Sequence, residues 1–499
     1  MKARDPIKVY DARWEEGEFS DGEVVRLFEA ALIYGRRLGV DTVTISRDAR
    51  LGAPRVMEIG VEVAVRAGFM VLLCTDPIST PMSYFMAAQS SIERPGTMGL
   101  TITASHNPGG YIGLKPTVPT VRAIGLDSGP DGGLTSVREI YHGSERLPES
   151  AGGRLRLIDP AEDYIAASAV AAGVGAGELA GVEVVLDAFN GSAGSELYRA
   201  LERAGARVHP LRLVPDGRFP TGAPNPTSQG KMADAVAEAQ RIGSAVVIGV
   251  DGDGDRLVFG DRRGVLDAGF ASIAILAVDP SFTGPGEAVP ALYDPKVNPI
   301  ALEAWSRFRV RPLLFRNGHS QIKDYMASSS ARFGAEESGH YYHRLRYGSL
   351  EVDAENSIVT ALRFLKGVQE SSGALDNLWE LQGRVYSAGE INFQFEEQST
   401  VDLAMSDVVE RLVAEGATPV SSTPDGIDLG GTQVSRGIKV GPGGITLDRG
   451  WYSGYLRSST NERAVLRSFF SAGDEETGKR IGAEVTRLLR ETYRGRQIE

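Results

Sequence analysis

Short apolar strands alternate with helices along most of this chain, and that alternation limits the folds open to it. Residues 43–45, 71–74 and 99–104 are runs of β-branched, apolar or small residues typical of strands. Residues 23–38 and 54–67 between them are expected to be helical, the first because Val24, Leu27, Phe28, Ala31 and Leu32 recur at helical spacing. Strands that alternate with helices predict an α/β fold with a mainly parallel sheet.

The same pattern occurs twice more, which predicts a chain of several domains. Strands are expected at residues 182–187, 207–213 and 245–250, and again at 288–293 and 310–315. From about residue 372 the pattern changes, with helix-like stretches at 403–415 and 475–493 around short strands and Gly-rich turns. A chain of 499 residues is also too long for a single core. We therefore expect three similar α/β domains with mainly parallel mixed sheets, at residues 1–155, 156–258 and 259–371, and a C-terminal α+β domain at 372–499.

Composition narrows the class of partner. The net charge of −12 disfavours nucleic acid and anionic membrane surfaces. No apolar run approaches the ~20 residues of a membrane helix, and the first residues lack an apolar signal segment. The single cysteine, Cys74, cannot form an intrachain disulfide, which fits a reducing cytosol. We expect a cytoplasmic protein, monomer or homodimer, with a small-molecule partner and without nucleic-acid or membrane partners.

A serine stands where the strand at 99–104 meets a turn. The sequence Ser105-His106-Asn107-Pro108 ends that strand, and two glycines follow. A hydroxyl at a strand end can act on a ligand, although Ser105 and Asn107 in isolation would more often only cap the turn. Adjacency of Ser105 and His106 does not predict a hydrolase dyad, because neighbouring side chains on a strand point apart.

Three aspartates alternate with glycines directly after the apolar strand at 245–250. Asp251, Asp253 and Asp255 repel one another unless a cation lies among them, and an oxygen-only donor set suits a hard ion such as Mg²⁺. A solvated acidic turn is the simpler alternative. An EF-hand is a poor match, because Arg256 and Arg262 occupy the positions of its glycine and its last glutamate.

Two further polar turns carry candidate binding groups. Glu336 and Ser338 stand two residues apart and could bond to vicinal hydroxyl groups. Arg457 precedes several hydroxyl residues, an arrangement that can cradle a phosphate monoester or simply cap the next helix.

Four stretches resemble motifs of the α-D-phosphohexomutases, the family of phosphomannomutases and phosphoglucomutases. The serine stretch is similar to Thr-Ala-Ser-His-Asn-Pro followed by Tyr-Asn-Gly-x-Lys, with Ile112 in place of Asn. The acidic loop matches Asp-Gly-Asp-x-Asp-Arg, and residues 335–340 resemble the sugar loop Gly-Glu-x-Ser-Gly-His, with Ala335 for Gly. Residues 457–463 resemble the family's phosphate loop Arg-x-Ser-Asn/Gly-Thr-Glu/Thr-Pro, but Thr460 and Asn461 are interchanged and Arg463 replaces Pro. A fifth stretch, residues 10–14, resembles the family's opening Tyr-Asp-Ile-Arg-Gly, with Trp14 in place of Gly.

The resemblance implies four domains around a central cleft and a reversible transfer of a phosphoryl group between positions 1 and 6 of a mannose or glucose phosphate. It further implies a phosphoserine, Mg²⁺, and a hexose 1,6-bisphosphate as intermediate and activator. The residues it implies are Ser105, Lys115, Arg13, His340, His106 and Arg256 for catalysis; Ser105, Asp251, Asp253 and Asp255 for the metal; Glu336, Ser338, His319, Lys296 and Tyr10 for the sugar; and Arg457, Ser459, Thr460 and Asn461 for the phosphate.

Two alternatives stay open. Ile112 in place of Asn and the altered loop at residues 457–463 motivate a non-catalytic sugar-phosphate binding protein on the same fold. Glucosamine phosphate mutases carry a very similar sugar loop, so a glucosamine phosphate is a second candidate substrate. The general base cannot be assigned among Lys115, Arg13 and His340.

Overall fold

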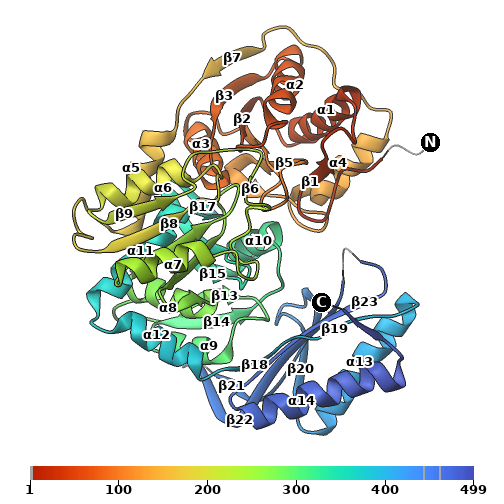
Figure 1. Ribbon diagram of the computed structural model, residues 1–499. Helices are drawn as coiled ribbons and strands as arrows, with labels where there is room; N and C mark the ends of the chain where they lie inside the picture. Colours follow the sequence, from red (N-terminus) through yellow and green to blue (C-terminus); the bar gives the residue numbers. More distant parts are fainter. Residues whose placement is uncertain (1–3, 442–443, 460–461, 499) are drawn as a thin grey trace. The chain divides into compact units, whose positions relative to one another are not determined.

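A computed structural model describes residues 4–441, 444–459 and 462–498 (Figure 1). The chain divides into two compact units. The first unit is Met1–Leu266, Gly318–Gly334 and Ser338–Glu370, and the second is Asp267–Asn317, Ala335–Glu337 and Ser371–Glu499. Among the residues described, no helix combines the length and the apolar character that a membrane crossing needs.

The first sheet belongs to the first unit and is mixed. Its strands run in the order β1-β5-β4-β2-β3-β7, with β6 beside β5. β2 is parallel to β3 and β4, whereas β5 is antiparallel to β4. The strands are β1 (Ala12–Glu15), β2 (Thr42–Arg47), β3 (Met70–Pro77), β4 (Thr97–Ile102), β5 (Tyr111–Val118), β6 (Arg122–Ala123) and β7 (Arg154–Leu157), and the helices are α1 (Asp21–Arg37), α2 (Ala53–Arg66), α3 (Thr80–Glu93) and α4 (Gly133–His142).

Local sequence signals explain where these elements begin. Ser20 caps α1 in a capping box with Glu23, and Ser79 caps α3 by accepting from the backbone of Met82. Residues 9–11 form a bend before the first strand, and the Lys8 N–H donates across it to the Asp11 carbonyl at 2.7 Å. The strand proper starts at Ala12, where the backbone pairs with β5.

The second sheet has the order β12-β11-β10-β8-β9 and also lies in the first unit. β8 is parallel to β9 and β10, and β11 is antiparallel to β10. All five residues of β10 are buried, as its apolar sequence predicts. The elements are β8 (Glu183–Asp187), β9 (Arg207–Leu211), β10 (Val246–Val250), β11 (Leu257–Asp261) and β12 (Gly264–Leu266), with α5 (Ala161–Ala172), α6 (Gly194–Arg203) and α7 (Ala233–Ile242).

The third segment contributes to both units. In the second unit, β13 (Val289–Tyr293) and β14 (Val310–Leu314) pair in parallel. In the first unit, β16 (Tyr341–Tyr347) and β17 (Leu350–Glu355) form an antiparallel hairpin. The remaining elements are β15 (Phe333–Ala335), α8 (Ala268–Val278), α9 (Pro299–Trp305), α10 (His319–Ser329), α11 (Ser357–Glu370) and α12 (Ala374–Gly383).

The last segment, drawn in blue in Figure 1, is an antiparallel sheet in the second unit with α13 and α14 packed against it. Its core contains Phe393, Val408, Tyr452 and Phe470. Its elements are β18 (Tyr386–Glu390), β19 (Asn392–Gln394), β20 (Thr418–Ser422), β21 (Asp428–Gly441), β22 (Gly444–Ser458), β23 (Val465–Ala472), β24 (Arg496–Ile498), α13 (Gln398–Ala414) and α14 (Glu475–Arg487). The predicted fold class, three α/β segments and a C-terminal α+β segment, is confirmed; the four domain boundaries stay a prediction.

Candidate active site

The loop between β4 and β5 holds Ser105 in an unusual conformation. Ser105 has a left-handed backbone (φ +54°) and is 2% exposed. Its N–H donates to the hydroxyl of Thr103 at 2.9 Å. A left-handed backbone is uncommon for residues other than glycine and persists only where the surroundings impose it, so this loop is held in shape by tertiary contacts.

Arg50 supplies most of those contacts. Its guanidinium is fully buried, is paired with Asp48 at 3.0 Å, and donates to four carbonyls of the serine loop. The acceptors are the carbonyls of Ser105 (2.7 Å), Asn107 (2.7 Å), Pro108 (2.6 Å) and Tyr111 (3.0 Å). Arg50 is not among the site residues predicted from the sequence. Its sequence context is an Asp two residues before an Arg near a strand end. Such a context does not predict a hydrogen-bond partner 55 residues away.

The three aspartates predicted to bind metal lie together beside this serine, in the first unit. Asp251, Asp253 and Asp255 follow β10 and are buried, with one carboxylate oxygen of each within 4.8 Å of the others. The Ser105 hydroxyl is 3.5 Å from Asp251 Oδ2, although 146 residues separate the two in sequence. The structure therefore places a buried hydroxyl against a buried carboxylate trio.

These carboxylates suit a hard divalent cation. Asp253 Oδ2 accepts from Lys115 at 2.9 Å, but Asp253 Oδ1 is buried and has no hydrogen-bond partner within the described part of the chain. Lys115 also donates to Asp255 Oδ2 at 2.7 Å. A buried carboxylate oxygen without a partner is costly, and a cation with oxygen ligands would remove that cost. The residues present fit the Mg²⁺ that the sequence predicts.

The electrostatics of the trio depend on Lys115. Burial, and then repulsion by Asp255 and Asp253, raise the pKa of Asp251 well above its ordinary value. Burial alone would also raise the pKa of Asp255, but the charge of Lys115 and then the contact with His340 outweigh it and hold that pKa well below its ordinary value. Burial alone would lower the pKa of Lys115, but Asp253 and Asp255 raise it, so Lys115 stays protonated at neutral pH.

Two further predicted catalytic residues lie at the serine loop. Arg13 pairs with Asp11 at 2.8 Å and donates to Asn107 Oδ1 at 2.8 Å. His106 Nδ1 is 3.2 Å from the Ser105 hydroxyl. The expectation that the Ser105 and His106 side chains point apart is wrong, because Ser105 lies in a left-handed turn and not on the strand. Burial, then repulsion by Arg256 and Arg13, lower the pKa of His106 to about 2, so its imidazole is neutral.

Five more of the predicted catalytic and sugar-binding residues also lie in the first unit. His340 Nε2 is 3.3 Å from Asp255 Oδ1, and His340 Nδ1 is 2.9 Å from the Ser338 hydroxyl. His319 begins α10, with its ring centroid 5.8 Å from that of Tyr10. Both ring nitrogens of His319 are buried without a hydrogen-bond partner among the residues described, so they are available to a ligand. Arg256 is half-buried, with its Nε 3.9 Å from Asp251 Oδ2.

The other two predicted sugar-binding residues lie in the second unit. Glu336 is buried, and Asp294 is close enough that burial and then the charge of Glu336 raise the pKa of Asp294 to about 6. The Lys296 side chain, just beyond β13, pairs with Glu390 Oε1 at 2.5 Å.

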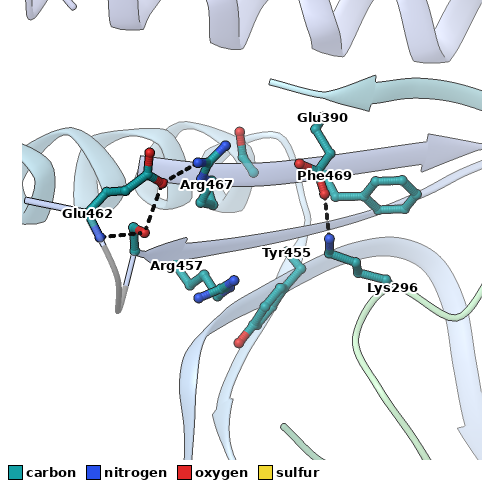
Figure 2. A pocket seen from close by; sticks show the side chains of 9 residues that line it. Lys296, Glu390, Tyr455, Arg457, Glu462, Arg467 and Phe469 are labelled. Atoms are coloured by element: carbon teal, nitrogen blue, oxygen red, sulfur yellow. Dashed lines mark hydrogen bonds and ion pairs between the residues drawn. The ribbon is translucent and has the colours of Figure 1, made fainter. Parts of the chain in front are cut away.

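A cavity of about 250 Å³ in the second unit contains the predicted phosphate-binding residues Arg457 and Ser459 (Figure 2). Arg457 on β22 stands directly opposite Arg467 on β23. The cavity is lined by Lys296, Glu390, Tyr455, Arg457, Ser459, Glu462, Arg467, Ser468 and Phe469.

Arg457 differs from the other two cations of this cavity. Lys296 pairs with Glu390, and Arg467 pairs with Glu462 (Figure 2). The Arg457 side chain has no hydrogen bond or ion pair to any residue that the structure describes. An unpaired guanidinium in a cavity is suited to a phosphate oxygen. Thr460 and Asn461, also predicted to bind phosphate, lie outside the described residues.

Comparison with known proteins places the chain in a family. Models described as phosphoglucomutase/phosphomannomutase alpha/beta/alpha domains I, II and III match residues 6–124, 162–264 and 272–385, together more than half of the chain. The protein "Phosphohexose mutases" of Xanthomonas campestris pv. campestris is 27% identical over 97% of this chain and 99% of its own length. "Phosphomannomutase/phosphoglucomutase" of Pseudomonas putida is 25% identical over 93% of this chain and 92% of its own.

A solved structure shows the same fold. The crystal structure of a phosphoglucomutase/phosphomannomutase family protein from Burkholderia thailandensis superposes with a TM-score of 0.78, covers 98% of both chains and is 23% identical. The resemblance seen in the four sequence motifs is thus confirmed by matches along almost the whole length. The chain belongs to the phosphoglucomutase/phosphomannomutase family and is a phosphohexomutase, an enzyme of the isomerase class.

Proposed function

We propose that this enzyme moves a phosphoryl group between positions 1 and 6 of mannose or glucose phosphate, with Ser105 as the residue that carries the group. The observation that supports this best is the Ser105 hydroxyl at 3.5 Å from a buried aspartate trio. A hydroxyl that is merely structural has no need of three buried carboxylates beside it, whereas a phosphoserine needs a cation to balance its charge.

In the first half-reaction, the bond between phosphorus and Ser105 Oγ breaks while phosphorus bonds to the free hydroxyl of the sugar phosphate. The hydroxyl's proton passes to a basic side chain, for which His340, against Asp255, is our candidate, and Ser105 Oγ takes up a proton as it is released. Lys115 donates to both Asp253 and Asp255, so we assign it the role of a fixed positive charge and not that of the base. The product of this step is a hexose 1,6-bisphosphate.

In the second half-reaction the bisphosphate turns round. The bond between its other phosphorus and the sugar oxygen breaks while that phosphorus bonds to Ser105 Oγ, and the proton of the Ser105 hydroxyl ends on the sugar oxygen. Arg457 and Ser459 would hold the phosphate that is not reacting, and Glu336, Ser338, His319, Lys296 and Tyr10 would hold the sugar in both orientations. Mg²⁺ bound by Asp251, Asp253 and Asp255 would supply charge neutralisation in the transition state.

Two measurements on the purified enzyme test the proposal. Intact mass should show one phosphoryl group that is absent from Ser105→Ala. With Mg²⁺ and a hexose 1,6-bisphosphate activator, a panel of glucose, mannose and glucosamine phosphates should show interconversion of 1- and 6-phosphates, highest for glucose or mannose. No turnover of any member of the panel, with binding retained, would identify a non-catalytic binding protein instead.

A further inference from the structure

The N-terminus of α3 bonds to one residue of the aspartate loop in two ways. The Thr80 N–H donates to the Asp253 carbonyl at 2.8 Å, and the Thr80 hydroxyl donates to Asp253 Oδ2 at 2.6 Å. Thr80 and Asp253 are both fully buried. The first residues of a helix have backbone N–H groups without partners inside the helix, and here one of them binds the loop.

The two carboxylate oxygens of Asp253 differ in their hydrogen bonds. Oδ2 accepts from both Thr80 and Lys115, at 2.6 and 2.9 Å, while Oδ1 has no partner among the residues that the structure describes. Two donors on one oxygen fix the rotation of the carboxylate. Neither Asp251 nor Asp255 receives a hydroxyl donor in any contact that the structure gives apart from the 3.5 Å approach of Ser105.

We propose that Thr80 is a positioning residue of the metal site: its hydroxyl, together with Lys115, holds Asp253 Oδ2 and thereby presents Oδ1 to the divalent cation. The inference rests on the proposed function only in taking Asp253 as a metal ligand. Groups that orient metal ligands from behind contribute strongly to metal affinity, commonly ten- to hundredfold.

The helix end that carries Thr80 is itself held in place. The Ser79 hydroxyl bonds to Glu196 on α6, which is buried and has no cationic partner within the described ranges. On the loop side, the Ser357 hydroxyl donates to the Gly254 carbonyl at 2.7 Å.

Gly254 shows how close the loop and the helix end are. It has φ +78°, and a Cβ there would lie 2.9 Å from the Ser79 Cβ and 2.5 Å from the Ala193 Cβ. No side chain fits between them. Thr80 is therefore presented to Asp253 by a rigid helix end, as a positioning role requires.

The test compares two substitutions of Thr80 in the full-length protein. Thr80→Val keeps the shape and removes the O–H donor, whereas Thr80→Ser keeps the donor. Isothermal titration with Mg²⁺ alone, without substrate, should give a Kd about ten- to hundredfold higher for Thr80→Val and within about threefold of wild type for Thr80→Ser.

Thr97→Val is the matched control. Thr97 is also a buried threonine, but its hydroxyl donates only to the Arg94 carbonyl, at 2.6 Å. The same chemical change there should leave the Kd for Mg²⁺ unchanged. If Thr80→Val does not fold, Thr80→Ala replaces it in the comparison.

A folded Thr80→Val with wild-type Mg²⁺ affinity would overturn the proposal, as would a Thr80→Ser variant that loses as much affinity as Thr80→Val. Asp253→Asn separates this outcome from failure of the metal site itself. If Asp253→Asn also binds Mg²⁺ like wild type, the assignment of the trio is wrong; if it alone loses binding, only the role of Thr80 is wrong.

Discussion

Arg457 is the clearest single residue on which to test phosphate binding, because it is the cavity cation without a carboxylate partner in the described structure. Charge-assisted bonds to a phosphate contribute about 1.5–3 kcal/mol each. Arg457→Gln should therefore lower kcat/KM for the hexose phosphate about ten- to hundredfold, as measured by steady-state kinetics. Mg²⁺ affinity should stay unchanged.

Arg463→Gln provides the control for Arg457→Gln. Arg463 is exposed and does not line the cavity, so it loses the same charge without the same contact. An equal loss of kcat/KM in both variants would mean that only the general electrostatic field matters, and the specific role of Arg457 would be refuted.

Glu462 gives a second test at this scale, with the opposite sign. Its carboxylate forms an ion pair with the guanidinium of Arg467, the residue directly opposite Arg457 in the sheet (Figure 2). An incoming phosphate has to compete with that carboxylate. Glu462→Gln should release Arg467 and lower KM for the hexose phosphate severalfold, whereas the exposed Glu491→Gln should not. An unchanged or higher KM in Glu462→Gln would contradict the competition.

At the scale of elements, α6 carries an unusual buried acid. Glu196 is bonded to Ser79, and burial raises its pKa from 4.5 to about 8. Between about pH 4.5 and 8, Glu196 therefore stays protonated in the folded protein but is ionised in the unfolded chain. Because of this difference, the free energy of unfolding falls as pH rises through that range. Glu196→Gln removes this proton and keeps the side-chain oxygen.

Urea unfolding of Glu196→Gln and wild type between pH 5 and 8 measures the effect. The stability of the variant relative to wild type should increase by up to about 1.4 kcal/mol per pH unit, the value for one proton. Glu202→Gln, an exposed position on the same helix, should show no such trend. A pH-independent difference for Glu196→Gln would show that Glu196 is ionised in the folded protein.

Much of the architecture at this scale follows from local sequence. The strands before the serine and aspartate loops were predictable because β-branched and apolar runs end at glycines, aspartates and prolines, which fix both the strand and the place where it stops. The helix predicted at 475–493 is α14 only to Arg487, after which Leu488–Thr492 form a π-helical turn. Periodicity does not distinguish one helical hydrogen-bond pattern from another.

The parts of the site that sequence could not predict depend on partners distant in the chain. Thr80 reads as an ordinary helix start after Ser79, and its target Asp253 is 173 residues away. From the sequence, Arg50 is only a polar residue near a strand end, but in the structure it donates to four carbonyls of the serine loop. Such contacts are set by how sheets pack, which no short window of sequence contains.

At the scale of the whole molecule, the acidic trio and the phosphate cavity belong to different compact units, so ligands of each should be distinguishable in the intact chain. Mg²⁺ alone, at a hundred times its Kd, should raise the free energy of unfolding of the trio's surroundings by about 2.7 kcal/mol. Hydrogen exchange of the full-length protein should slow at residues 251–255, at the start of α3 and at the Ser105 loop, and should not change in β22 and β23. Asp253→Asn should remove the protection. Mg²⁺-dependent protection that appears in β22 and β23, or that survives in Asp253→Asn, would mean that the cation binds elsewhere and that the carboxylates are buried for another reason.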